Sequence, residues 1–157
     1  MTSMHRVGLL VPSSNTTMET EVPAMLHARE RVHPEDTFTF HSARLRMEDV
    51  TPEGLRAMNE QTGRATIELA DLRPDVVATA CLVAIMAQGL GYHRQVEEDF
   101  RRVVAENGAR SKVMTSAGAL IDGLKKLGAK KISLLAPYIK PLTAKVVAYI
   151  EHEGIEV

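Results

Sequence analysis

The sequence predicts an α/β protein built on a doubly wound parallel sheet. Short apolar runs typical of buried strands alternate with longer stretches whose apolar residues recur at helical spacing. The run at residues 76–80 is almost continuously apolar, as expected of a strand that a parallel sheet covers on both faces. With 157 residues, 45% of them hydrophobic, the chain is long enough to bury a core around such a sheet.

The first strand is expected at residues 5–11, where an apolar run is closed by Pro12 and a polar turn. A helix should follow this turn. Pro23 lies inside that helix and removes a backbone hydrogen bond, so we expect it to begin a second helical segment.

The next strand, helix and strand are expected between residues 37 and 80. Residues 37–43 are rich in β-forming side chains and are predicted to form the second strand. Thr51 should cap one helix, with Pro52 at its first position, and apolar residues continue that helix to Leu69. Residues 76–80 form the third strand and lead directly to Cys81.

The rest of the chain repeats this alternation. A helix at residues 94–107 should bury its apolar residues and expose Glu97, Glu98 and Asp99 as a solvated face. The other predicted elements are a strand at 112–115, a helix at 116–127, a strand at 131–136, a helix containing Leu142, Val146, Val147 and Ile150, and the beginning of a strand at 154–157.

A weak internal repeat indicates two similar domains. Residues 7–12 resemble residues 132–137, and each segment is followed by a polar turn and a helix. We therefore expect residues 1–111 to form a first α/β domain that carries the candidate nucleophile, and residues 112–157 to begin the second. By this repeat the counterpart of Cys81 would lie beyond Val157, so the chain is expected to be truncated.

The composition argues against several partners. Nineteen basic and twenty acidic residues leave a net charge of -1, so nucleic acid is not an expected partner. The apolar runs are too short to span a membrane, and one cysteine cannot form an internal disulfide, so a cytoplasmic location is expected. The six histidines lack metal-ligand spacing, and Gly89 and Gly91 lack the third glycine of a dinucleotide-binding motif. No metal or cofactor is predicted.

Cys81 is the first candidate for catalysis. It ends the third strand, and ligands bind beyond the carboxyl ends of strands in open parallel sheets. A thiol that begins a helix there has backbone N–H groups and a helix dipole to stabilise its thiolate. The alternative is a small buried side chain with a packing role, as most lone cysteines have.

Polar residues at the same edge are candidates for binding an anion. Ser14 and Asn15 follow the first strand, where hydroxyl, amide and helix-terminal N–H groups could cradle a carboxylate without an arginine. The alternative for them is an ordinary turn and helix cap. Tyr138, after residues 131–136, is either a donor to a substrate carboxylate or a packed aromatic with its hydroxyl in water.

With these residues identified, the sequence resembles the maleate cis-trans isomerases, within the aspartate/glutamate racemase superfamily that also contains arylmalonate decarboxylases. Residues 7–21 resemble that family's opening and residues 79–84 its first cysteine motif. Residues 115–120 and 136–138 follow in the expected order, so the resemblance covers essentially the whole chain.

The resemblance implies two pseudo-symmetric domains with one cysteine from each at a shared active site, in a homodimer. It implies conversion of maleate to fumarate without a cofactor, in the degradation of nicotinate or related aromatics. By this analogy Cys81 is the nucleophile, and Asn15 and Tyr138 bind one substrate carboxylate. The backbone amides around Leu82 and Val83 hold the other. The family's second cysteine is absent from this sequence.

Three other functions stay open. A racemase of an acidic amino acid needs two opposed cysteines, and Leu82 and Val83 stand where many racemases have Asn-Thr. An arylmalonate decarboxylase is expected to carry its key cysteine in the second domain. A catalytically silent fragment would retain only the ability to bind a dicarboxylate.

Overall fold

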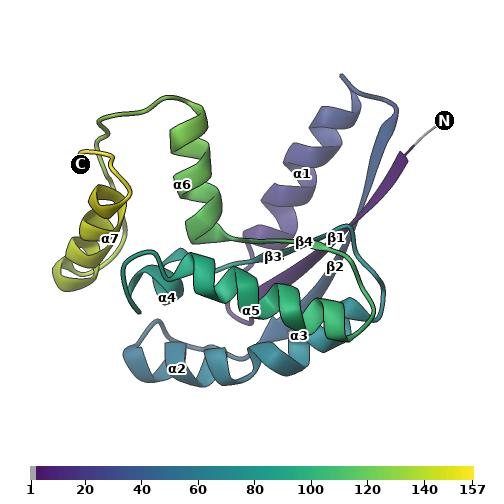
Figure 1. The fold of residues 1–157 in the computed structure, drawn as a ribbon, viewed down its shortest axis with the longest axis horizontal. Coiled ribbons are helices and arrows are strands. Elements are labelled where there is room, and N and C mark those ends of the chain that lie inside the picture. The colour runs from purple at the N-terminus through teal and green to yellow at the C-terminus, as the bar shows by residue number, and fades with distance from the viewer. Residues whose placement is uncertain (1–2) are drawn as a thin grey trace. The chain divides into compact units, whose positions relative to one another are not determined.

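The structure is a computed structural model that describes residues 3–157. Its four-stranded parallel sheet has the order β2-β1-β3-β4 (Figure 1). The chain divides into two compact units. Unit 1 comprises Met1–Ala80 and Asp99–Met114, and unit 2 comprises Cys81–Glu98 and Thr115–Val157. The expected boundary between residues 111 and 112 concerns the domains of the whole protein and stays a prediction.

The sheet is the framework of unit 1. Its central strand β1 (Ser3–Pro12) pairs in parallel with β2 (Asp36–Leu45) along its whole length and with β3 (Val76–Thr79) over its middle. The edge strand β4 (Lys112–Thr115) follows β3 in the sheet, and only its last residue is counted with unit 2. These four predicted strands are confirmed, although the first two are longer than the apolar runs that predicted them.

Helices lie on both faces of this sheet, so the doubly wound arrangement is confirmed (Figure 1). Leu9 and the residues that share its face of β1 pack against α1 (Met18–Glu30). Successive residues of a strand point to opposite faces. Gly8 therefore faces the other way, where it lies against Leu69 of α3 (Thr62–Ala70).

The helix after β1 differs from its prediction, because α1 continues through Pro23 without a break. Pro23 cannot donate a hydrogen bond to the carbonyl of Glu19, four residues earlier. Glu19 is only partly buried, and water can satisfy its carbonyl. The expected second helical segment at Pro23 is therefore wrong.

The single helix expected from Thr51 to Leu69 is in fact two. Thr51 caps α2 (Pro52–Glu60), as predicted, by accepting a hydrogen bond from the N–H of Gly54. The break falls at Gln61, whose N–H bonds to Met58, three residues earlier. The Gln61 carboxamide oxygen also accepts from the N–H of Arg46 (3.1 Å), which fixes the chain at this point.

Unit 2 is built from helices. Contributing elements are α4 (Leu82–Met86), the first turns of α5 (His93–Glu106), α6 (Ser116–Lys126) and α7 (Lys140–His152). Helix α4 contacts both α6 and α7. They enclose a core that contains Val83, Ala117, Ile121, Val146, Tyr149 and Ile150.

The strand expected at residues 131–136 does not form a ladder. Its one pairing is a parallel bridge between Lys131 and Glu156, which also accounts for the strand expected to begin at 154–157. Ile132 is half-buried against the core of unit 2, whereas Leu135 is fully exposed. The alternating burial suits a strand, but a strand is completed only by neighbours along its length, and within residues 3–157 it has this single bridge.

Within residues 3–157, no helix combines the length and apolar character needed to cross a membrane.

Candidate active site

The loop after β1 places Asn15 at the beginning of α1. Its side-chain Oδ1 accepts hydrogen bonds from the backbone N–H groups of Thr17 and Met18, both at 2.9 Å. Asn15 thus forms the polar turn of the alternative interpretation, although the N-cap residue of α1 is Thr17, whose own side chain makes no capping hydrogen bond. Because the oxygen accepts these bonds, the amide nitrogen is the free end of the side chain. Within residues 3–157 it has no protein acceptor, and its two N–H groups remain available to an anion.

The same loop is held by β2 and by the segment that follows it. Ser13 Oγ accepts a hydrogen bond from the N–H of Met47 at 2.9 Å. Arg44 Nη2 donates to the carbonyls of Ser13 and Asn15, at 2.8 and 3.0 Å, and its other nitrogen pairs with Glu19. Sequence reasoning missed this role of Arg44, since nothing near residue 15 in the sequence indicates it.

Ser14 lies next to Asn15 in this loop and is exposed. Its predicted role in binding an anion is not decided by the structure and stays a prediction.

Cys81 lies between β3 and α4 in a strained conformation. Its backbone has φ 80° and ψ 73°, the left-handed region that non-glycine residues rarely adopt, which costs about 1–3 kcal/mol. The turn makes Cys81 the N-cap of α4. The N–H groups of Leu82 and Val83 open that helix and have no acceptor within it. The Val83 side chain is buried in the core, so this residue can serve a ligand only through its backbone.

Burial raises the pKa of the Cys81 thiol above its ordinary value. The backbone N–H of Ala84 lowers the pKa, but by less, and Cys81 makes no regular capping hydrogen bond. The expected stabilisation of the thiolate by α4 is thus only partial. A helix of five residues has a small dipole, and desolvation of the sulfur outweighs it.

Tyr138 belongs to the same unit and interacts electrostatically with Cys81. The pKa of its hydroxyl is raised first by burial and then by the negative charge of the Cys81 thiolate. The phenol therefore stays protonated at neutral pH, and its hydroxyl can donate a hydrogen bond.

Glu97 was also misjudged from the sequence. Its Oε1 accepts from the backbone N–H (2.9 Å) and the hydroxyl (2.8 Å) of Thr115, which in turn caps α6 through the N–H of Gly118. Glu97 therefore fixes the corner between β4 and α6, and its carboxylate is not simply solvated. Next to this corner the Ser116 hydroxyl is buried and has no hydrogen-bond partner within residues 3–157.

The predicted site residues fall into both units. Cys81, Leu82, Val83 and Tyr138 lie in unit 2, whereas Ser14 and Asn15 lie in unit 1. Among residues 3–157 no three His, Cys, Asp or Glu side chains form a group that could hold a metal ion.

Comparison with known proteins places this arrangement in a family. A family model described as arylmalonate decarboxylase matches residues 7–157. The maleate isomerase of Geobacillus stearothermophilus is 58% identical over 157 residues, which is 100% of this chain and 62% of the relative. The crystal structure of the maleate isomerase Iso from Pseudomonas putida S16 matches with a TM-score of 0.95 and 56% identity, covering 99% of this chain and 62% of that one.

A third match bears on the cysteine. A Nocardia farcinica maleate cis-trans isomerase, solved as a cysteine-to-serine mutant with a covalently bound succinylcysteine intermediate, matches with a TM-score of 0.93 and 48% identity. The match covers 99% of this chain and 62% of that one, so the chain spans about three-fifths of the length of such relatives. The chain belongs to the arylmalonate decarboxylase family, and within it closely resembles the maleate isomerases.

Proposed function

We propose that this chain carries one half of the active site of a maleate cis-trans isomerase, with Cys81 as the nucleophile. The observation that carries the proposal is the setting of Cys81. Cys81 lies on a strained turn and is followed by the N–H groups of Leu82 and Val83, which have no acceptor within α4. The charge of its thiolate also raises the pKa of Tyr138. The covalent succinylcysteine of the Nocardia farcinica relative supports covalent chemistry at a cysteine in this family.

The reaction begins when the Cys81 thiolate forms a bond to one alkene carbon of maleate. The π electrons move to the other alkene carbon and into the carboxylate attached to it. The former double bond is now single and rotates. When the electron pair returns, the trans double bond forms and the carbon–sulfur bond breaks, which releases fumarate and regenerates the thiolate.

Charge builds up on one substrate carboxylate during the addition, and neutral donors held in place stabilise that charge most effectively. We assign this work to the N–H groups of Asn15 Nδ2 and to the hydroxyl of Tyr138. Ser14 supplies a further hydroxyl from the same loop as Asn15. The backbone N–H groups of Leu82 and Val83 hold the other carboxylate at the start of α4.

The raised pKa of Cys81 gives the reaction a pH dependence. Only the thiolate adds to the alkene, and burial keeps the thiol protonated at neutral pH. The rate should therefore rise with pH through the pKa of Cys81. The rest of the implied picture, a cytoplasmic homodimer that degrades nicotinate or related aromatics, is proposed on the resemblance alone.

The test is a proton NMR time course of maleate with the protein, without added cofactor. Fumarate should form with the unmutated protein and with Ser133→Ala, a change at an exposed position of unit 2. It should not form with Cys81→Ala. Turnover by Cys81→Ala would refute the assignment of the nucleophile.

Decarboxylation of an arylmalonate is the second candidate, favoured by the description of the family model that matches residues 7–157. The same NMR experiment with phenylmalonate separates the two, because a decarboxylase would yield phenylacetate from it and leave maleate unchanged.

A further inference from the structure

A cavity lies in unit 1, at the edge of the sheet where the strands begin. Its volume is about 650 Å³. Its walls are His5 near the start of β1, the first residues of β3 and β4, and the turns that precede β3 and β4. Cys81 follows the opposite end of β3, so this cavity belongs to the other edge of the sheet. Pockets of this volume hold small organic ligands in proteins.

Three permanent cations line the cavity: Arg73, Arg110 and Lys112. All three are exposed, and none of them forms an ion pair or a side-chain hydrogen bond with any residue in the range 3–157. The only carboxylate in the lining is Asp75, and its Oδ2 already accepts from the backbone N–H of Arg6 at 2.7 Å. The lining therefore has a surplus of positive charge.

Several other arginines of this protein have a carboxylate partner. Arg44, Arg64 and Arg94 each pair with a glutamate. Like charges that converge without a partner repel one another, and a bound anion relieves that repulsion.

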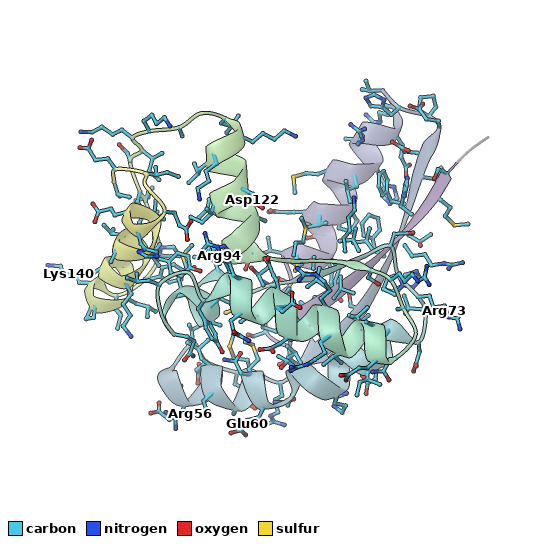
Figure 2. The ribbon with its side chains drawn as sticks, in the orientation of Figure 1. Arg56, Glu60, Arg73, Arg94, Asp122 and Lys140 are labelled. Carbon is cyan, nitrogen blue, oxygen red and sulfur yellow. The ribbon has the colours of Figure 1, made fainter. Side chains whose placement is uncertain are left out.

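The walls of the cavity are held by hydrogen bonds to backbone carbonyls. Ser111 Oγ donates to the carbonyl of Pro74 at 2.5 Å, and the N–H of Lys112 donates to the carbonyl of Asp75 at 2.9 Å. These bonds join the turn before β3 to the turn before β4. Arg73 itself has φ 48°, in the left-handed region, and Figure 2 shows its side chain at the margin of unit 1. The turn thus presents Arg73 at the cavity at a cost in backbone strain.

We propose that this cavity binds a small organic phosphate. An arginine guanidinium matches the geometry of a phosphate with two parallel hydrogen bonds, and a lysine adds a point charge. Two arginines and a lysine suit a group with two negative charges better than a single carboxylate. Because the volume exceeds that of a bare phosphate ion, the remaining space accommodates an organic body such as a ribose or another small polar group. This site is separate from the proposed isomerase chemistry and does not depend on it.

The test is calorimetric titration of the full chain with adenosine monophosphate, with inorganic pyrophosphate and citrate as parallel probes. Adenosine monophosphate should bind, and added salt should weaken the binding. Arg110→Ala should lower the affinity about tenfold or more, the effect of losing a charge-assisted hydrogen bond. Arg73→Gly should do the same while keeping the fold, because glycine adopts a positive φ without strain.

The matched control is Arg56→Ala, which removes an exposed arginine of α2, away from Arg73 (Figure 2). It should leave the affinity unchanged. Binding of citrate but of neither phosphate probe would overturn the organic phosphate assignment in favour of a polycarboxylate. No binding of any probe at millimolar concentration, or equal losses in the Arg110 and Arg56 variants, would overturn the site itself. Loss of maleate turnover would leave this result unaffected, so the two proposals fail separately.

Discussion

Glu153 is the most strongly perturbed carboxyl group of unit 2, and replacing it by glutamine should destabilise that unit. Its Oε1 and Oε2 accept from the two terminal nitrogens of Arg94, at 2.8 and 2.6 Å, and Oε2 also accepts from Lys125 at 2.8 Å. The carboxylate is 3% exposed. It therefore connects α5, α6 and the end of α7 through one buried charge.

The size of the effect follows from the pKa of Glu153. The hydrogen bonds from Arg94, followed by that from Lys125, lower the pKa from 4.5 to about 2, although burial works against them. A shift of this size corresponds to at most about 3 kcal/mol of folding free energy. Arg94 is more than half exposed, so water screens part of the interaction, and about 1–2 kcal/mol is expected.

The sign of the pH dependence is fixed by the same values. Since the folded pKa lies below the unfolded one, the stabilisation is complete above about pH 4.5 and is lost as the pH falls towards about 2. Urea unfolding of the wild type and Glu153→Gln, followed by circular dichroism, should therefore differ at pH 7, differ less at pH 3 and converge at about pH 2. Glu151→Gln, on the exposed side of α7, is the matched control. Equal midpoints for the two variants at pH 7, or a difference that grows in acid, would refute the reasoning.

Three further predictions concern the candidate site and its supports. Gly118→Ala should cost about 1 kcal/mol, because its Cβ would collide with Glu97 Oε1 and displace the carboxylate from Thr115. In a Glu97→Ala background, thermal denaturation should show that this cost is removed. Asn15→Asp keeps the oxygen that accepts from the start of α1 but loses the N–H donors. It should therefore retain the melting temperature and weaken maleate binding about tenfold or more in a titration. Asn15→Ala should weaken binding as well and also lose about 1 kcal/mol of stability. Alkylation of Cys81 by iodoacetamide should speed up with pH to a midpoint above that of an ordinary thiol, and a midpoint below it would contradict the effect of burial.

Much of the fold followed from patterns that are local in the sequence. A strand such as β3 is visible in the sequence as an apolar run, and Thr51 followed by Pro52 indicates the start of a helix. The strand and the helix start were therefore predictable. The position of Cys81 at the end of β3 followed from the same logic.

The errors arose where distant residues decide the outcome. Pro23 was expected to interrupt a helix, but partial exposure lets the helix tolerate the lost hydrogen bond. The strand expected at 131–136 has the right composition, yet a strand depends on partners that composition does not supply. Likewise the sequence predicts Glu97 to be one of three solvated acidic residues. Its hydrogen bonds to Thr115, eighteen residues later, depend on the fold.

The positions of the candidate site residues at the ends of strands were predictable from the sequence, but their electrostatics were not. The sequence shows a cysteine that begins a helix, which favours the thiolate. It does not show that this helix has five residues or that burial dominates, so the net direction of the pKa shift was missed. Arg44, which holds the Asn15 loop from a different strand, was equally invisible.

The most direct test of the central claim is mass spectrometry of the protein quenched in acid during incubation with maleate. Cys81 is the only cysteine in this sequence, so an adduct at a thiol has one possible site within it. The account predicts a covalent adduct with the mass of one maleic acid on the peptide that contains Cys81, and its absence from Cys81→Ala. An adduct that persists in Cys81→Ala, or fumarate production without any adduct at Cys81, would contradict the claim that this thiol attacks the substrate.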